Sequence, residues 1–451
     1  MNDNIVAIST AMGVGAISII RLSGKDVIPI TNSIFKGKNL EKVDSHTINY
    51  GYIINNNEII DEVLVTIMKS PKTYTTEDVV EINCHGGIAT TNKILEIILT
   101  KDIRLAEPGE FTKRAFLNGR IDLTKSEAVM DLLESKTETS RKLAISQLQG
   151  NTYNMIENFR NDLKDLISSV EVNIDYPEYY DIEVVTIEKI KEKVKQMKEK
   201  LDKIIKESRN TKILKSGIDT LIVGRPNVGK SSILNKFLDE EKAIVTDIAG
   251  TTRDIVEGQV ILNNISLNII DTAGIRTTED KVEKIGVEKS LSLIERADLV
   301  IVVLNGEEEL TNKDKEILEK TKDKTTIVVI NKNDLNQKID KELLKEYTVV
   351  STNTNSIDGI DPLKNKIIEM FHLEEIESKD YNYLTNIRQI SLAKQAYQKL
   401  EEVEKGIISE LPIDMIEIDL RDCFDLLGEI IGKTYSDEII DNLFEKFCVG
   451  K

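Results

Sequence analysis

The stretch GRPNVGKS, residues 224–231, decides the fold of the central part of this chain. It fits the pattern G-x-x-x-x-G-K-[ST], and the apolar run 221–223 before it predicts a short buried strand. Residues 232–238 after it predict a helix. In that setting the glycines let backbone N–H groups close around phosphates, Lys230 reaches the β and γ oxygens, and the Ser231 hydroxyl binds Mg²⁺. The stretch therefore predicts a nucleotide-binding α/β domain.

Two more loops follow predicted strands in the order that a GTPase requires. DTAG, residues 271–274, follows the strand 267–270, where Asp271 can hold Mg²⁺ through water and the Gly274 amide can sense a γ-phosphate. NKND, residues 331–334, follows the strand 326–330. The Asp334 carboxylate only accepts hydrogen bonds, so it suits the N1–H and 2-amino donors of guanine and rejects adenine. The three loops together predict a GTPase.

The segment GTTRD, residues 250–254, supplies the switch threonine, with Thr252 the candidate Mg²⁺ ligand. Ile275 stands in the residue after D-x-x-G, where a Ras-type enzyme carries its water-orienting glutamine. Hydrolysis must therefore recruit another polar group. The nearby candidates are Arg276, Glu279, Asp280 and Glu283.

Composition places the chain among globular proteins of about three domains, since it has 451 residues, 40% hydrophobic and 31% charged. It has no apolar run of membrane-spanning length and no signal-like start, and its three cysteines form no CxxC pair. We therefore expect a reducing, cytoplasmic location without a membrane span or zinc site. The formal net charge of −18 means that any nucleic-acid contact needs a local basic patch or a basic partner.

The hydrophobic period divides the chain into four segments. Residues 1–118 alternate short strands (16–20, 63–68 and 79–83) with helices; 119–215 are helical; 216–371 alternate strand and helix; and 372–451 are helical again. This predicts a multidomain α/β plus all-α protein, with the nucleotide-binding domain inserted into one helical domain. One helical face comprises Ile156, Phe159, Leu163, Leu166 and Val170, and a coiled-coil-type face comprises Ile187, Ile190, Val194, Met197, Leu201 and Ile204.

Residues 186–215 are basic within an acidic chain, with eleven Lys or Arg against five Asp or Glu. A solvated helix face and an RNA-facing patch both fit this composition.

Further motifs lie outside the nucleotide loops: IRLSG (20–24), YTTEDVVE (74–81) with HGG (85–87), PGEFTKRAFLNGR (108–120) and the terminal FCVGK (447–451). With them the chain resembles the MnmE (TrmE) family of bacterial tRNA-modification GTPases over essentially its full length. The resemblance implies an N-terminal folate-binding domain that dimerises, a discontinuous helical domain and an inserted G domain. It departs from the family at Ala11-Met12, where relatives often carry a proline-containing turn, and at residues 351–353, where Ser-Thr-Asn replaces a more usual Ser-Ala guanine loop.

The resemblance also implies a reaction and its partners. The homodimer would work with a flavoprotein, MnmG (GidA), in a heterotetramer. Together they would add a carboxymethylaminomethyl or aminomethyl group to C5 of the wobble uridine of certain tRNAs, using 5,10-methylene- or 5-formyl-tetrahydrofolate. Potassium would activate hydrolysis by ordering loops when two G domains meet.

The site residues follow from the loops and the resemblance. K⁺ is expected on Asn227, Thr246, Ile248 and Thr251, with Glu283 orienting the attacking water. Glu81 is expected on the pterin, with Arg21, Arg120 and Lys451 as further folate contacts, although surface ion pairs would explain these residues as well. The nucleotide-binding set comprises Asn227, Val228, Gly229, Lys230, Ser231, Ser232, Thr246, Asp247, Ile248, Ala249, Gly250, Thr251, Thr252, Asp271, Thr272, Ala273, Gly274, Asn331, Lys332, Asp334, Ser351, Thr352 and Asn353.

Cys448 lies three residues before the last residue, Lys451, which fits a prenylation box poorly. An incidental thiol is the simple interpretation, whereas the resemblance favours a functional tail. On that hypothesis the end of the chain is a short flexible arm, and the thiol acts as acid or nucleophile in the uridine chemistry.

A second function class is a regulatory GTPase that binds ribosomal RNA and modifies nothing. It predicts an RNA-binding module after residue 371, such as a KH fold with a G-x-x-G loop. That region shows only the pattern of amphipathic helices.

Overall fold

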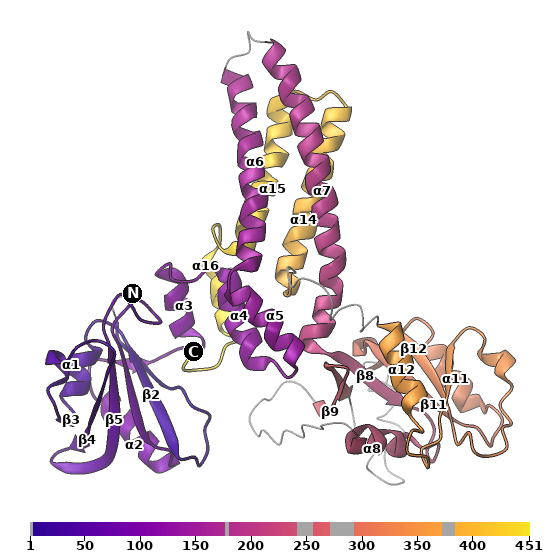
Figure 1. Ribbon diagram of the computed structural model, residues 1–451, viewed down its shortest axis with the longest axis horizontal. Helices are drawn as coiled ribbons and strands as arrows, with labels where there is room; N and C mark the ends of the chain where they lie inside the picture. Colours follow the sequence, from indigo (N-terminus) through magenta and orange to yellow (C-terminus); the bar gives the residue numbers. More distant parts are fainter. Residues whose placement is uncertain (1–2, 176–179, 241–255, 271–292, 372–383) are drawn as a thin grey trace. The chain divides into compact units, whose positions relative to one another are not determined.

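The computed structural model describes residues 3–175, 180–240, 256–270, 293–371 and 384–451. They fall into two compact units, one of residues 1–130, 147–198 and 391–451 and one of residues 131–146 and 199–390. Figure 1 shows their elements, which comprise two sheets and a set of long helices. The predicted combination of α/β and all-α parts is confirmed. Within these ranges no helix is both long enough and apolar enough to span a bilayer.

The first sheet has seven strands in the order β3-β4-β5-β6-β2-β1-β7, all antiparallel except the β1–β7 pair. Helices α1 and α2 share one core with the inner face of the sheet. The strands predicted at 16–20, 63–68 and 79–83 are confirmed as β2, β5 and β6. The elements are β1 Ile5–Ile8, β2 Ile17–Ser23, α1 Val27–Asn32, β3 Phe35–Gly37, β4 Thr47–Asn55, β5 Glu58–Met68, β6 Val79–His85, α2 Ile88–Leu99, β7 Arg104–Leu105 and α3 Glu110–Leu117.

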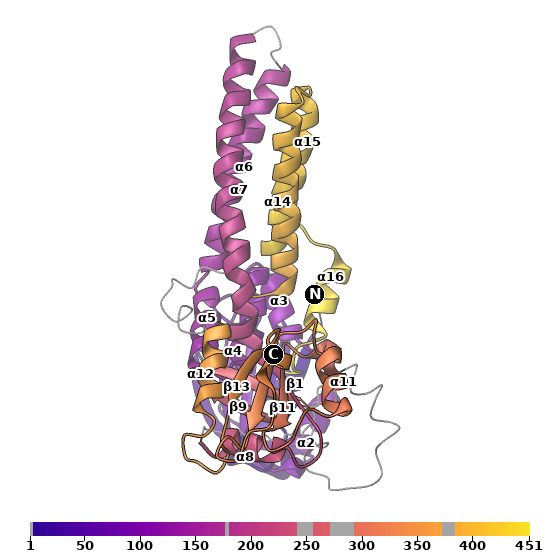
Figure 2. The same cartoon turned by 90° about the vertical axis from the view of Figure 1, so that its right-hand side faces the viewer.

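Helices from both sides of the nucleotide-binding segment form one bundle, in which α6, α7, α14 and α15 run side by side (Figure 2). Lys198 of α7 is paired with Glu404 of α14, and Arg421 of α15 with Glu171 of α6. The discontinuous helical domain is therefore confirmed. Its elements are α4 Leu123–Glu134, α5 Glu138–Leu148, α6 Asn151–Asp175, α7 Tyr180–Ser216, α14 Ile387–Ile408, α15 Ile413–Ile431 and α16 Asp437–Phe444.

The predicted apolar face of α6 is confirmed, since all five of its residues are buried. On α7 the prediction is confirmed at Ile190, Val194, Met197 and Leu201, which are buried, whereas Ile187 is only partly buried. It is wrong at the next position, because Ile205 is buried and Ile204 only partly. A strict alternation of three and four residues gives a period of 3.5, whereas a straight helix repeats every 3.6 and drifts away from it. The step after Leu201 is therefore four residues.

The second sheet has six strands in the order β13-β12-β11-β8-β10-β9, parallel except for β9. Every residue of β11 and β12 is buried, as expected of parallel strands covered on both faces. The carboxyl ends of β8 and β12 carry the phosphate and guanine loops, the usual place for a ligand in such a sheet. The elements are β8 Ile218–Val223, α8 Lys230–Glu240, β9 Val256–Leu262, β10 Ile265–Ile270, β11 Leu299–Asn305, α11 Asn312–Lys320, β12 Thr326–Asn331, β13 Thr348–Ser351 and α12 Asp361–Met370.

Candidate functional site

The phosphate loop joins β8, in the middle of its sheet, to the first turn of α8. Gly224 and Gly229 have φ angles of +151° and +103°, which side chains rarely adopt. A Cβ atom on Gly224 would lie 2.4 Å from the carbonyl oxygen of Val303, so the loop has no room for one. These two glycines let the backbone fold back over the start of α8. The first N–H groups of a helix have no carbonyl partner within the helix, so those of α8 can bind a phosphate.

The Lys230 ammonium lies inside the loop. Its Nζ donates hydrogen bonds to the carbonyl oxygens of Gly224 and Arg225, both at 2.7 Å. Burial lowers the pKa of this lysine, and within the described ranges no carboxylate pairs with it. A phosphate in the loop would supply an anion, so Lys230 fits its predicted role. Ser231 and Ser232 follow it on the exposed side of the first turn of α8.

The guanine loop is tied directly to the phosphate loop through Asn331, the last residue of β12. Its Nδ2 donates to the Val228 carbonyl at 3.1 Å, and its Oδ1 accepts from the Thr352 hydroxyl at 3.3 Å. A Cβ atom on Gly229 would lie only 2.0 Å from Asn331 Nδ2. Three predicted loops, those of residues 224–231, 331–334 and 351–353, therefore meet at this one asparagine.

The rest of the guanine loop is held by its backbone. Lys332 has a φ of +61° and pairs with Glu307 at 3.0 Å, while the Thr352 carbonyl accepts from the Asn333 N–H at 3.0 Å. Asp334 is exposed and stands free of the strand, where a base could reach it. Ser351 ends β13, Thr352 is buried, and the Asn353 N–H donates to the Gly359 carbonyl at 3.0 Å.

Several predicted residues lie outside the described part of the chain. They are Thr246, Asp247, Ile248, Ala249, Gly250, Thr251 and Thr252 of the switch segment, Asp271, Thr272, Ala273 and Gly274 of the second loop, and Glu283 with its alternatives Arg276, Glu279 and Asp280. Of the four predicted K⁺ ligands only Asn227 is described. It is exposed, with a φ of +64°.

Sequence reasoning missed the anchor of Arg225 inside the phosphate loop. Its Nε donates to the buried carboxylate of Asp314 at 2.9 Å, and its Nη2 to Glu308 at 2.8 Å. Asp314 also closes the capping box of α11 with Thr311. The pattern Thr-x-x-Asp at 311–314 was the available signal, since it marks a helix start whose acid can serve a second partner.

A second cluster lies on the first sheet, where Arg21 of β2 stands directly opposite Glu81 of β6. The Arg21 Nε donates to the Glu81 carboxylate at 2.9 Å, and its Nη1 donates to the Gly450 carbonyl at 3.1 Å. Burial and the positive charge of Arg21 lower the pKa of the Lys451 ammonium, which lies close to both. The structure therefore brings Arg21, Glu81 and Lys451 together.

Arg120 lies apart from that trio. Its guanidinium is over the ring of Tyr74, 4.9 Å from the ring centroid, and donates to the Tyr74 carbonyl at 3.2 Å. Among the described residues, no recorded contact joins it to Arg21 or Glu81. The Tyr74 hydroxyl shares a hydrogen bond with that of Thr112 at 2.9 Å.

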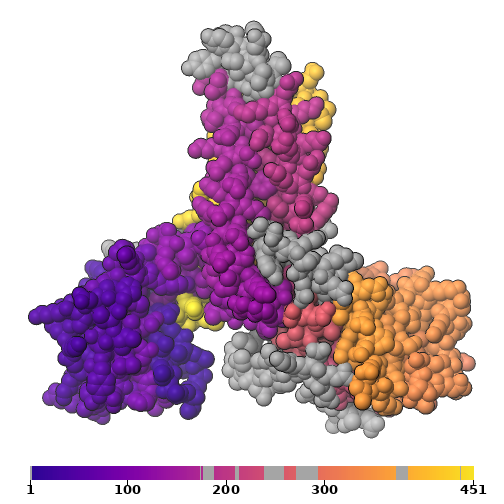
Figure 3. Space-filling view, in the orientation of Figure 1, coloured from indigo at the N-terminus to yellow at the C-terminus, as the bar shows by residue number. Residues whose placement is uncertain are grey.

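The predicted flexible arm at the end of the chain is wrong, because the tail is docked. The carbonyls of Cys448 and Lys451 accept from the N–H groups of Gly109 and Phe111 at 3.2 and 3.1 Å, and Gly450 accepts from the Ser9 hydroxyl at 3.1 Å. In Figure 3 the yellow atoms of this end lie against the N-terminal part. The tail docks because burial of apolar side chains stabilises it: Phe444 and Phe447 are buried in a cluster with Phe116, Leu123 and Ile440. The Cys448 side chain itself stays exposed.

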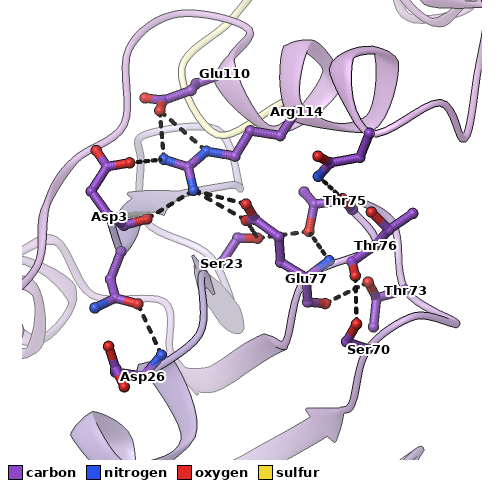
Figure 4. Close-up of polar contacts among 12 residues, drawn as sticks. Asp3, Ser23, Asp26, Ser70, Thr73, Thr75, Thr76, Glu77, Glu110 and Arg114 are labelled. Carbon is purple, nitrogen blue, oxygen red and sulfur yellow. Dashed lines mark hydrogen bonds and ion pairs between the residues drawn. The ribbon is translucent and has the colours of Figure 1, made fainter. Parts of the chain in front are cut away.

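A buried arginine joins two of the motifs that carry the resemblance, those of residues 74–81 and 108–120 (Figure 4). Arg114 is 1% exposed and donates to Glu77 at 3.1 Å, to Glu110 at 2.9 Å and to the Asp3 carboxylate at 3.1 Å. Burial opposes ionisation of Glu110, yet hydrogen bonds from Arg104, the Glu107 N–H and Arg114 keep its pKa below the usual value. This network fixes α3 to the sheet, and α3 begins at the turn on which the tail docks.

The fold and the nucleotide loops define a multidomain P-loop GTPase whose nucleotide-binding domain interrupts a helical domain. Family models described as "GTP-binding protein TrmE N-terminus" and "MnmE helical domain" match residues 4–120 and 123–448. The chain belongs to the MnmE family. Relatives named "tRNA modification GTPase MnmE" include those of Ligilactobacillus salivarius (52% identical), Streptococcus thermophilus (51%) and Bacillus cytotoxicus (50%). Each alignment covers 100% of this chain and 98%, 98% and 99% of the relative, respectively.

Proposed function

We propose that this chain hydrolyses GTP to drive the modification of C5 of the wobble uridine in certain tRNAs, adding a carboxymethylaminomethyl or aminomethyl group. As a member of the MnmE family it is a GTPase of tRNA modification. The observation that carries the nucleotide part is the hydrogen bond from Asn331 to Val228, which couples the base-reading loop to the phosphate loop. The proposed domains are an N-terminal domain of residues 1–118, a helical domain made of residues 119–215 and 372–451, and a G domain of residues 216–371.

Within the G domain, Asp334 reads guanine, Lys230 neutralises the β and γ phosphates, and Ser231 with Thr252 holds Mg²⁺. The first two roles are supported by the exposed carboxylate of Asp334 and by the position of the Lys230 ammonium inside its loop. The main-chain N–H groups of residues 228–232 complete the phosphate cradle.

Hydrolysis depends on K⁺, held by Asn227, Thr246, Ile248 and Thr251 when two G domains meet. The ion supplies the positive charge that an arginine finger supplies elsewhere, and Glu283 orients the attacking water. Asn227 supports this assignment, since its exposed amide stands at the rim of the phosphate loop. Its amide oxygen is the kind of hard ligand that K⁺ prefers.

The first unit takes a 5,10-methylene- or 5-formyl-tetrahydrofolate at Arg21, Glu81 and Lys451, with Arg120 as a further contact. The donor set fits this group: a carboxylate accepts from the guanine-like donors of a pterin, and two cations suit an acidic tail. When bound, the folate supplies the one-carbon unit. Glu81 orients the ring, and Arg21 holds both Glu81 and the docked tail in place.

The chain forms a homodimer through its first sheet. The sheet face opposite the core exposes Ile48, Tyr50 and Leu64, whose side chains are 67%, 55% and 46% exposed. Tyr50 and Leu64 are direct cross-strand partners. Contiguous apolar groups of this kind on an antiparallel sheet are typical of a surface that another protein covers.

The homodimer works with the flavoprotein MnmG (GidA) in a heterotetramer, and tRNA is the substrate. The flavin of the partner carries the redox step, and the Cys448 thiol acts as acid or nucleophile in the uridine C5 chemistry. Two observations support a role for the thiol: it is exposed, and the docked tail holds it near Lys451 and the Arg21–Glu81 pair.

Mass analysis of tRNA nucleosides tests the proposal, using cells with the gene, without it, and without it but carrying Lys230→Ala. We expect the C5 group to vanish in the last two strains and to return with the wild-type gene. A regulatory GTPase that binds ribosomal RNA would leave wobble uridines normal in all strains. The described residues beyond 384 form only the helices α14, α15 and α16, which gives that alternative no RNA-binding fold.

A further inference from the structure

A pocket of about 400 Å³ lies between α6 and α15, in the helical bundle. The two helices run side by side in Figures 1 and 2. The pocket is lined by Arg160, Asn161, Lys164 and Ser168 of α6 and by Phe424 and Asp425 of α15, with ion pairs at its ends. Asn161, Lys164 and Ser168 are exposed, so the pocket opens to solvent along this stripe.

Arg160 is the unusual member of this set. It is 7% exposed, and its Nε and Nη1 atoms are buried without a hydrogen-bond partner among the described residues. The nearest carboxylate oxygen, on Glu157, is 3.9 Å from Nε, too far for a hydrogen bond. Burial lowers the pKa of this guanidinium, although an arginine remains charged in any case. A buried, charged donor left unsatisfied is costly, so its persistence calls for a ligand that compensates it.

Two neighbours hold the guanidinium in place. It lies over the ring of Phe424, 3.9 Å from the centroid, a geometry that orients a planar cation and leaves its edge for hydrogen bonds. Gly428 makes the room, because a Cβ atom there would lie 1.9 Å from Arg160 Nη1. Two residues of α15 therefore determine where the guanidinium lies.

The remaining charges of the pocket favour an anion. Glu157 is paired with Lys433, and Glu171 with Arg421. The second carboxylate oxygen of Glu157 is buried 3.9 Å from Arg160 Nε, without a hydrogen-bond partner among the described residues. Lys164, one turn from Arg160, has no ion pair within the part of the chain that the structure describes. The lining as a whole carries four cationic side chains against three carboxylates, an excess of one positive charge; the cations are Arg160, Lys164, Arg421 and Lys433, and the acids are Glu157, Glu171 and Asp425.

We propose that this pocket binds a phosphate group, with Arg160 as its buried anchor and Lys164 as its second cation. Asn161 and Ser168 lie on the same helix stripe and can donate further hydrogen bonds. A phosphate has enough oxygens to bond the guanidinium edge and the ammonium together, and arginine is the side chain best suited to it. The phosphate belongs either to an RNA backbone or to a small phosphorylated compound.

Calorimetric titration with inorganic phosphate tests the site. The full chain is first saturated with Mg²⁺ and a non-hydrolysable GTP analogue, so that the phosphate loop is occupied. We expect binding by the wild type and a loss of about tenfold or more in Arg160→Met. Gly428→Ala, which keeps the charge and displaces the guanidinium, should lose as much. Arg141→Gln, a surface arginine paired with Glu138, is the matched control and should bind as the wild type does.

Lys164→Gln keeps the test decisive if Arg160→Met folds poorly, because Lys164 is exposed and its loss disturbs no packing. It should weaken phosphate binding severalfold. Absence of phosphate binding by the wild type, or equal binding by the wild type and all three pocket variants, would overturn the proposal and leave Arg160 as a structural cation on Phe424.

A second arm identifies the source of the phosphate. Binding of a tRNA anticodon stem-loop is measured against salt for the wild type and Lys164→Gln. If the RNA backbone supplies the phosphate, the variant weakens RNA binding and lowers the salt slope by about one. If RNA binding is unchanged while phosphate binding falls, the ligand is a small phosphorylated compound.

Discussion

Asn331 Nδ2 donates a hydrogen bond to the Val228 carbonyl at 3.1 Å, across 103 residues of sequence. The bond joins the loop expected to read guanine to the loop expected to hold the phosphates. One side chain therefore links the two loops, and it is packed so closely on Gly229 that no Cβ atom fits between them.

Gly229→Ala should therefore weaken GTP binding by roughly tenfold or more, since positive-φ strain and displacement of Asn331 each cost about 1–3 kcal/mol. Titration with a fluorescent GTP analogue measures it. Gly119→Ala is the control, because Gly119 also has a positive φ, of +73°, but with open space around it. Unchanged GTP affinity in Gly229→Ala would mean that the loops move independently.

Asp334→Asn should lower kcat/KM for GTP by roughly 100-fold or more and shift preference toward xanthosine triphosphate. The carboxylate accepts from two donors of guanine, whereas an amide offers a donor that matches the 2-carbonyl of xanthine. Steady-state rates with GTP, ATP and xanthosine triphosphate measure the change, with the exposed Asp323→Asn as control. Equal turnover of ATP and GTP by the wild type would contradict the assignment of Asp334.

GTP turnover should be faster in K⁺ than in Na⁺ by roughly tenfold, because the cation stabilises charge that develops between the β and γ phosphates. Asn227→Ala should erase the difference without abolishing GTP binding. Asn235→Ala, exposed on α8, should keep it. A wild type whose rate is indifferent to the cation would refute the potassium site and the dimerisation tied to it.

Arg21→Gln should weaken binding of 5-formyl-tetrahydrofolate by about tenfold, as measured by calorimetry. The substitution removes the cation that pairs with Glu81 and holds the Gly450 carbonyl. Lys25→Gln removes an exposed lysine of the same unit and should leave affinity unchanged. If the wild type does not bind this folate, Arg21 and Glu81 form a structural ion pair only.

Cys448→Ser should retain GTPase activity and leave wobble uridines unmodified in cells, because the proposed function gives the thiol a part in the C5 chemistry and none in nucleotide binding. Val449→Ser, at the exposed neighbouring position, should leave both unchanged. The readouts are phosphate release and nucleoside mass analysis. Normal C5 modification in Cys448→Ser would show that the docked tail is structural.

Local sequence determined much of the fold. The phosphate loop, the strands β2, β5 and β6, and the buried face of α6 were all predictable, because each depends on spacings of two to four residues along the chain. The N-K-x-D loop was likewise visible as a local motif after a buried strand. At Ile205 the same local reasoning failed, because an apolar repeat of 3.5 residues and the 3.6-residue turn of a straight helix diverge only after several turns.

Tertiary structure alone decided how these pieces meet. Nothing near Cys448 predicts that its carbonyl accepts from Gly109, and nothing near Arg160 predicts that α15 places Phe424 and Gly428 against it. Two of the motifs that carried the family resemblance, those of residues 74–81 and 108–120, meet only in the fold, where Arg114 of the second pairs with Glu77 of the first. The contacts of the tail and of Arg160 join residues that lie hundreds of positions apart, and Arg114 reaches Glu77 across 37 positions. They depend on burial and charge compensation between elements, and a one-dimensional period does not encode either.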